Sequence, residues 1–161
     1  MPDMLVKLYE LPALAPHQER LAKAGIKLRH PLAFEKRAVV DWVNQEFGAE
    51  WASECDVAFA KQPVSCIIAV QDGKLLGFAC YDVTCKGFFG PTGVTAEARG
   101  QGVGRALLLA ALHGLAEMGY AYAIIGGAGP VDFYQKTVGA IEIEGSVPGI
   151  YRDRLPAGDQ T

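Results

Sequence analysis

A glycine-rich segment between a strand pattern and a helix pattern constrains the fold of this chain more than any other feature. Residues 99–105 read Arg-Gly-Gln-Gly-Val-Gly-Arg, after a β-type run at 88–96 and before a helical pattern that continues to 118. Glycines at alternate positions let a backbone turn sharply and bring its N–H groups close to a ligand. The first N–H groups of the following helix have no internal partners, and the helix dipole makes that end positive. The segment therefore predicts a strand–loop–helix unit that binds a phosphate group.

The spacing of the glycines excludes two common phosphate-binding loops. The dinucleotide fingerprint G-x-G-x-x-G fails from each possible start, and the pattern G-x-x-x-x-G-K-[ST] is absent. The positions where the fingerprint needs its third glycine hold other residues: Arg105, Leu107 and Asp132. Neither a dinucleotide loop nor a P-loop is therefore expected.

The pattern that fits is Arg-x-x-Gly-x-Gly, formed by Arg99, Gly102 and Gly104. It resembles the acetyl-CoA pyrophosphate loop of the GNAT family, the GCN5-related N-acetyltransferases. Val94 lies five residues before Arg99, where the family has the strand residue whose backbone binds the pantetheine arm. The resemblance implies acetyl-CoA as a co-substrate.

A second match lies downstream. The sequence Phe-Tyr-Gln-Lys at 133–136, followed by Gly139 and Ala140, resembles the family's helix-and-turn motif FYxKxGF. The matches together cover residues 64–140. The chain departs from the pattern at Ala96, where the family often has proline, and at 127–130, where it often has asparagine. It also departs at Val138, which is inserted before the glycine, and at Ala140, which replaces the phenylalanine. These departures bear on the acceptor side and not on the cofactor loop.

The resemblance implies an α/β (α+β) fold of the GNAT type, with a mixed, mostly antiparallel central sheet flanked by helices on both faces. Hydrophobic periodicity and turn residues predict helices at 16–24, 31–47, 49–60, 103–118 and 130–138. They predict strands at 4–11, 26–30, 65–71, 74–84, 88–96, 120–125, 141–144 and 149–155. Asp72-Gly73 predicts a hairpin turn. We expect one GNAT domain over 1–161, with 1–25 as an N-terminal extension of a strand and a helix.

Composition excludes several other classes. Half of the residues are hydrophobic, but no apolar run is long enough to span a membrane, and no signal-peptide pattern opens the chain. The four cysteines have no C-x-x-C spacing and pair with no histidine at ligand spacing, so we expect reduced thiols, no metal and a cytoplasmic protein. The net charge of −3 and the lack of a basic stripe argue against nucleic acid as a partner. The predicted strand at 4–11 adds an exposed edge, which favours a homodimer.

The resemblance assigns the cofactor side residue by residue. The Val94 backbone N–H would stabilise the thioester oxyanion, and the Tyr134 hydroxyl would protonate the departing thiolate. The residues expected to bind acetyl-CoA are Val94, Arg99, Gly100, Gln101, Gly102, Val103, Gly104 and Arg105.

The general base is less well defined. Some relatives have a glutamate early on the strand before the loop, where this chain has Phe88, and no carboxylate lies between 88 and 96. Asp82, on the preceding strand, is the first candidate. Water relayed through backbone carbonyls is another, and so are the glutamates of the two helices at 31–60: Glu46, Glu50 and Glu54. Trp42 and Trp51 are expected core anchors. The alternative is that one of them forms a wall of a substrate pocket between these two helices.

These observations favour an acetyl-CoA-dependent N-acetyltransferase. The enzyme would transfer an acetyl group to a primary amine of a small molecule or a protein by direct attack in a ternary complex, because no nucleophile-and-base pair is recognisable. One alternative is a non-catalytic acyl-CoA-binding regulatory domain. Another is an enzyme that uses a different acyl group or an alcohol acceptor.

Overall fold

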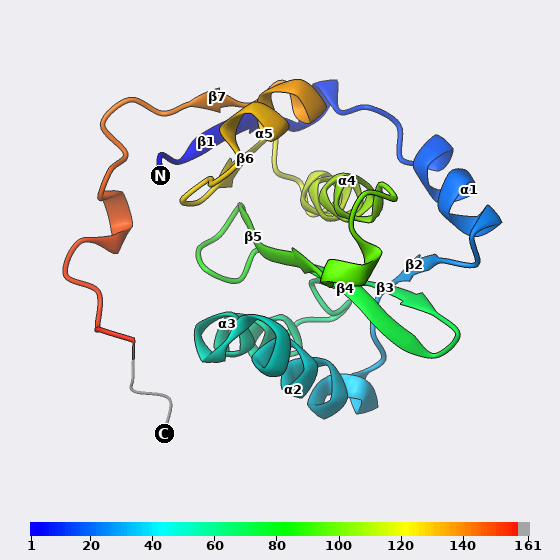
Figure 1. Cartoon of the computed structure of the whole chain (residues 1–161). Helices are drawn as coiled ribbons and strands as arrows, with labels where there is room; N and C mark the ends of the chain where they lie inside the picture. Colours follow the sequence, from blue (N-terminus) through cyan, green and yellow to red (C-terminus); the bar gives the residue numbers. More distant parts are fainter. Residues whose placement is uncertain (158–161) are drawn as a thin grey trace.

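The computed structural model describes residues 1–157 and has a central seven-stranded sheet with the strand order β2-β3-β4-β5-β6-β1-β7 (Figure 1). Neighbouring strands are antiparallel except for β5 and β6, which are parallel. The strands are β1 (Met4–Lys7), β2 (Lys27–Arg29), β3 (Cys66–Gln71), β4 (Lys74–Tyr81), β5 (Phe88–Val94), β6 (Tyr122–Ile125) and β7 (Ile141–Glu142). The predicted mixed, mostly antiparallel sheet is confirmed.

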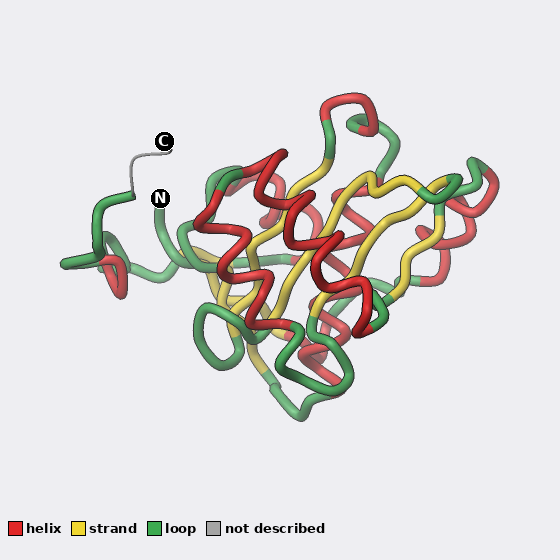
Figure 2. Tube along the Cα trace, turned by 90° about the horizontal axis from the view of Figure 1, so that it is seen from below, coloured by secondary structure: helices red, strands yellow, loops and turns green. Residues whose placement is uncertain are grey.

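Helices cover both faces of this sheet (Figures 1 and 2). The central helix α4 and the short α1 pack against one face, and α2 and α3 pack against the other. The helices are α1 (Ala15–Lys23), α2 (Lys36–Phe47), α3 (Ala49–Ala58), α4 (Val103–Glu117) and α5 (Val131–Val138). None of the described helices combines the length and apolarity needed to cross a bilayer.

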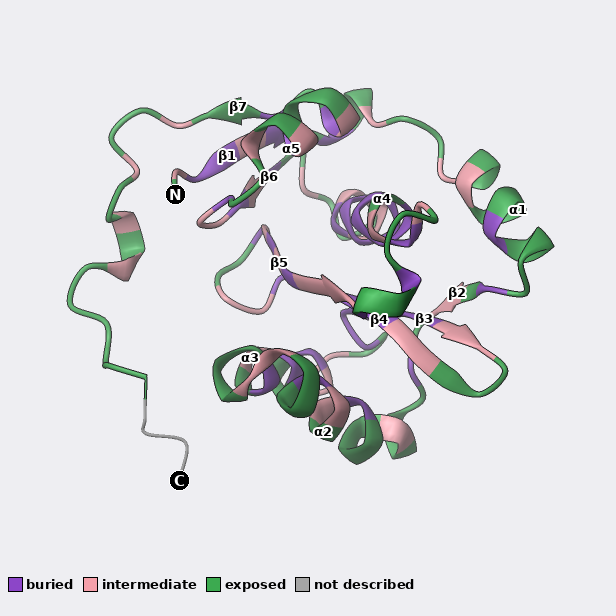
Figure 3. Ribbon diagram, viewed as in Figure 1, coloured by how far each residue is buried: buried purple, intermediate pink, exposed green. Residues whose placement is uncertain are grey.

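The alternation of side chains along β3 and β4 produces two hydrophobic cores (Figure 3). Ile67 and Ala79 face α4, whereas Ile68 and Phe78 face α2 and α3. Helix α4 is apolar on most of its surface because it lies in the first core, where Leu107, Leu109 and Leu112 are fully buried. A sheet covered on both faces explains why the strand patterns are almost continuously hydrophobic.

The β3–β4 hairpin turns at the predicted dipeptide. Asp72 and Gly73 have φ values of 50° and 74°, the left-handed pair that a two-residue hairpin requires. The sequence prediction is confirmed at this turn.

Two predictions for the ends of the chain are wrong. The strand expected at 4–11 ends at Lys7. Strand β1 pairs with β6 along its length and with β7 at Met4 and Leu5, so it is not the exposed edge from which the homodimer was predicted, and the homodimer stays a prediction. The strand expected at 149–155 is a single 3-10 turn, Gly149–Tyr151. Positive φ values of 57° at Gly149 and 60° at Asp153 interrupt an extended backbone there.

Candidate active site

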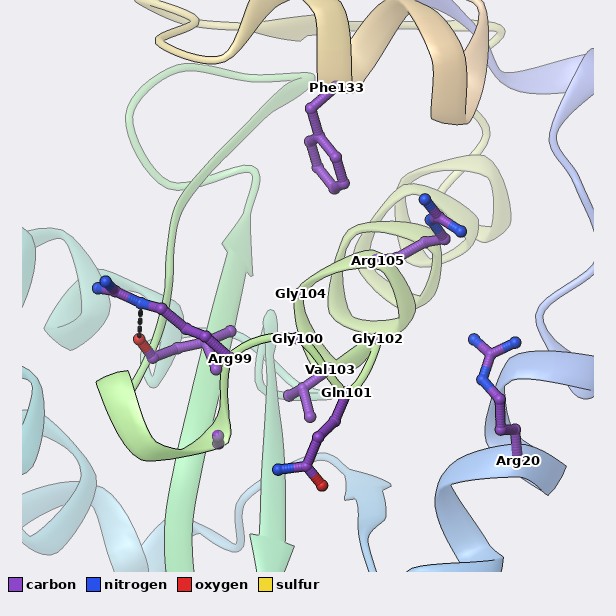
Figure 4. A pocket seen from close by; sticks show the side chains of 11 residues that line it. Arg20, Arg99, Gly100, Gln101, Gly102, Val103, Gly104, Arg105 and Phe133 are labelled. Atoms are coloured by element: carbon purple, nitrogen blue, oxygen red, sulfur yellow. Dashed lines mark hydrogen bonds between the residues drawn. The ribbon is translucent and has the colours of Figure 1, made fainter.

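The glycine loop ends at the first turn of α4 (Figure 4). Gly100 and Gly102 have φ values of 82° and 84°, so both use the left-handed conformation that favours glycine. Helix α4 begins at Val103, and no side chain within residues 1–157 caps its N-terminus. The loop therefore presents free backbone donors at the positive end of a long helix, as the sequence predicts.

These donors line a cavity of about 600 Å³. The structure brings all eight residues predicted to bind the cofactor to this one groove, which also includes Arg20, Ala98 and Phe133. Phe133 extends from α5 toward the loop, and Arg20 extends from α1 (Figure 4). The groove thus runs between the loop and two helices that are distant from it in the sequence.

Positive charge gathers on one side of the groove. A Cβ atom added at Gly102 would lie 3.0 Å from a guanidinium nitrogen of Arg20, so Arg20 is close to the loop. Arg105 lies near Arg20, on the first turn of α4 (Figure 4). Burial, followed by the charges of Arg20 and Arg105, lowers the pKa of the nearby His17 below its ordinary value. Arg99 points the other way, and its Nε donates to the Val94 carbonyl oxygen at 3.4 Å. Arg20 and Arg105 are therefore the cations best placed beside a bound diphosphate.

A larger cavity of about 1030 Å³ continues from this groove, because Val94, Gly104 and Phe133 line both. Its walls come from α3, β5, the β6–α5 loop, α5 and the C-terminal segment 147–155. The groove and the larger cavity meet at the end of β5, where the loop begins.

Strands β5 and β6 are no longer paired at this junction. Strand β5 pairs with β6 only at Phe88 and Phe89, although it stays paired with β4 as far as Val94. The amide of Thr95 donates to the Leu76 carbonyl of β4 at 2.8 Å. Because an antiparallel ladder alternates its hydrogen bonds, the Val94 N–H points away from β4 into the opening. The structure thus leaves a strand N–H free where the thioester oxyanion was expected.

Comparison with known proteins identifies the family. The model of the acetyltransferase (GNAT) family matches residues 36–140. This chain belongs to the GNAT family. No curated protein matches the chain.

Several solved structures share this GNAT fold. The glucosamine N-acetyltransferase region of a fungal multi-domain β-N-acetylglucosaminidase superposes with a TM-score of 0.72 at 16% identity, over 88% of this chain and 19% of that one. GCN5-related N-acetyltransferases from Sphaerobacter thermophilus (TM-score 0.68, 21% identity, 88% of this chain and 48% of that one) and Kribbella flavida (0.59, 18%, 88% and 53%) are also similar. The chain spans about half or less of the length of these proteins.

Tyr134 of this GNAT chain lies at the wall of the larger cavity. It is 6% exposed, its ring contacts Phe89 and Phe133 edge-on, and burial raises the pKa of its hydroxyl above the ordinary value. The phenol is therefore protonated at neutral pH and carries a proton that it could donate. Tyr134 and Val94 line the same cavity, and the role of Tyr134 as proton donor stays a prediction.

Asp82, the first candidate for the base, lies outside both cavities and is engaged elsewhere. Its carboxylate accepts from Lys61 Nζ at 2.7 Å, from the Gly87 amide at 2.6 Å and from the Tyr120 hydroxyl at 2.8 Å. Burial raises the pKa of Asp82, but these hydrogen bonds outweigh it and hold the pKa below its ordinary value. Asp82 has a φ of 59°, so it is better explained as the anchor of the β4–β5 turn.

This role gives a stability prediction. Asp82→Asn should lower the free energy of unfolding at pH 7 by about 1–3 kcal/mol, because buried donors lose a charged acceptor. The pKa of Asp82 in the folded protein is lowered below its unfolded value of about 3.9. The stability difference between the wild type and the variant is therefore fully present above the unfolded pKa and is lost as the pH falls through the folded pKa. Urea unfolding of both proteins at neutral and acidic pH measures the difference, and a constant gap down to the lowest pH would contradict the assignment.

Two other candidate carboxylates do lie in the larger cavity. Glu50 and Glu54 line it together with Trp51, whereas Glu46 is exposed on α2 and lines neither cavity. Trp42 is half-buried against Phe78. Of the two tryptophans, Trp51 is therefore the one at the cavity.

The described residues contain one group with metal-ligating chemistry, the thiols of Cys55, Cys66 and Cys80. Their sulfur atoms lie within 4.8 Å of one another, and all three residues are fully buried in the core beneath α2 and α3. Cys85 is exposed, and all four cysteines are free thiols. None of the four lines either cavity.

Proposed function

We propose that this GNAT protein is an acetyl-CoA-dependent N-acetyltransferase that acts on a primary amine of a small molecule or a protein. The observation that carries this proposal is the junction of the two cavities at the opened edge of β5. A basic groove with free backbone donors meets an apolar cavity there, and Val94 and Tyr134 lie on its walls. Acetyl-CoA has the matching chemistry, since a diphosphate and a thioester lie at different points of one extended molecule.

The residues that line the two cavities would have separate roles in binding and catalysis. The first-turn amides of α4, with Arg20 and Arg105, would hold the diphosphate. The Val94 N–H would stabilise the negative charge that develops on the thioester oxygen. Tyr134 would donate its proton to the sulfur as the C–S bond breaks. No cysteine among the described residues lines either cavity, which favours direct attack by the amine over an acyl-enzyme.

The assignment of Arg20 gives a prediction for cofactor affinity. Arg20→Ala should raise the Kd for acetyl-CoA about tenfold, which corresponds to the loss of about 1.4 kcal/mol for one charged contact. The effect should shrink at high salt because the guanidinium is exposed. Calorimetric titration measures it, and Arg37→Ala on the opposite helix layer is the matched control. Equal affinities of the two variants for acetyl-CoA at low salt would show that Arg20 does not contact the cofactor.

The activity itself is tested by titration with acetyl-CoA followed by a thiol-release assay across a panel of amines. The proposal predicts saturable binding and amine-dependent release of CoA. Binding without thiol release across the whole panel would favour the alternative, a non-catalytic acyl-CoA-binding domain.

A further inference from the structure

Apart from Tyr134, the aromatic walls of the larger cavity are not required by any step of the proposed acetyl transfer. Trp51 from α3 lines it on one side. Its remaining aromatic lining residues come from β5, α5 and the C-terminal segment: Phe88, Phe89, Phe133, Tyr134 and Tyr151. Flat aromatic walls bind apolar and aromatic bodies well and gain little from a hydrated polar chain. The cavity therefore favours an acceptor with an apolar or aromatic body.

Trp51 is held in place for such contacts. It is 37% exposed, a large value for an indole, yet its ring packs on Phe47 at 5.4 Å and on Phe78 at 6.2 Å between centroids. The side chain is thus fixed by the core on one face and open to the cavity on the other. A pre-positioned ring costs little entropy on binding, which makes Trp51 a favourable apolar contact for an acceptor.

The charges in the same cavity select for a cation. Glu50 forms an ion pair with Arg154, so its charge is offset. The carboxylate of Glu54 accepts a hydrogen bond from the neutral hydroxyl of Thr84. Within residues 1–157, no cation lies within ion-pair distance of Glu54. Arg154, which pairs with Glu50, also lines this cavity, so two carboxylates share one cation there, and an ammonium group would supply a partner for Glu54.

We propose that the acceptor is an arylalkyl primary amine, whose aromatic body lies against Trp51 and whose ammonium group is bound and deprotonated by Glu54. This assignment rests on the proposed N-acetyltransferase activity and specifies its substrate class. Strand β5 has no carboxylate, and Glu54 supplies one from α3, on another wall of the same cavity.

Protons and electron pairs balance in the proposed transfer. Glu54 takes one proton from the ammonium and passes it to solvent, and the nitrogen lone pair attacks the thioester carbonyl carbon. The C–N bond forms, the C–S bond breaks with its electron pair on sulfur, and the sulfur takes a proton from Tyr134. The nitrogen loses its second proton, which restores the phenol through solvent. The products are an N-acetyl amide, CoA with a free thiol, and one released proton.

Binding measured with matched ligands tests the substrate class without requiring turnover. 2-Phenylethylamine carries both the ring and the ammonium, butylamine lacks the ring, and 2-phenylethanol lacks the charge. Calorimetric titration in the presence of CoA should give a Kd for 2-phenylethylamine at least about tenfold below that for each of the others. Trp51→Ala should abolish the preference over butylamine, and Glu54→Gln should abolish the preference over 2-phenylethanol. Glu142→Gln, an exposed glutamate on β7, is the matched control and should leave both preferences intact.

Turnover tests the role of Glu54 as a base. Glu54→Gln should lower kcat with 2-phenylethylamine about 100-fold, whereas the control Glu142→Gln should leave kcat unchanged. An unchanged kcat in Glu54→Gln, or equal affinity for all three ligands in the wild type, would overturn the inference.

The failures of the two proposals can be distinguished. Thiol release that favours butylamine or a lysine peptide would overturn the substrate class and leave the N-acetyltransferase activity standing. Selective binding of 2-phenylethylamine without any thiol release would overturn the activity and support the ligand class.

Discussion

Replacing Gly104 by valine is expected to abolish binding of acetyl-CoA, with at least about a 100-fold rise in Kd. Gly104 lines both cavities at the first turn of α4, so a branched side chain would fill the space beside the free amides. Its backbone is not left-handed, and a Cβ there would lie 3.6 Å from a Val94 methyl, an ordinary contact. The variant should therefore fold, and calorimetric titration with acetyl-CoA measures the loss.

Graded variants separate blocked binding from general damage. Gly104→Ala adds only the Cβ and should cause a smaller loss of affinity with an unchanged melting temperature. Gly102→Val is a poor test, because valine at a φ of 84° is strained and would disturb the loop itself. Normal acetyl-CoA affinity in a folded Gly104→Val protein would show that the loop is not the diphosphate site.

Tyr134→Phe is expected to lower kcat about 100-fold, the usual range for loss of a general acid. The substitution removes one oxygen and keeps the ring that packs on Phe89 and Phe133. Because the lost interaction forms mainly in the transition state, the Kd for acetyl-CoA should stay within about threefold of the wild-type value. Steady-state kinetics and calorimetry measure the two quantities.

The pH–rate profile supplies the control for this prediction. Burial raises the pKa of Tyr134, so the phenol of the wild type stays protonated to a higher pH than an ordinary tyrosine. The basic limb of the pH–rate profile that comes from Tyr134 should disappear in Tyr134→Phe. A kcat near that of the wild type would make Tyr134 a packing residue. A large loss of acetyl-CoA affinity would instead make it a ground-state contact.

Local sequence patterns predict much of this fold because the conformations of its turns and helices are determined by adjacent residues. The Asp72-Gly73 turn, the left-handed glycines of the loop and the apolar helix after it each follow from the backbone chemistry of a few adjacent residues. The family resemblance then places Val94 and Tyr134, and the structure brings both to one cavity.

Features that depend on distant pairing could not be predicted in this way. The N-terminal extension is part of the core, since β1 pairs with β6 and β7, and α1 supplies Arg20 to the groove. An exposed arginine on a short polar helix carries no local signal for this role. Likewise, nothing near Asp82 in the sequence indicates that Tyr120 donates to it across the fold. Long-range contacts of this kind require the tertiary structure.

The central claim is acetyl transfer to an amine in one step, and a single-turnover experiment with acetyl-labelled acetyl-CoA tests it most directly. Enzyme in excess over the labelled substrate is mixed with the amine that gives the fastest thiol release in the panel, and the reaction is quenched at short times. The expected result is labelled N-acetyl amine formed in a 1:1 ratio with free CoA thiol, with no label on the protein at any time. Label that stays in bound acetyl-CoA, or that passes through an acetylated protein, would contradict the claim.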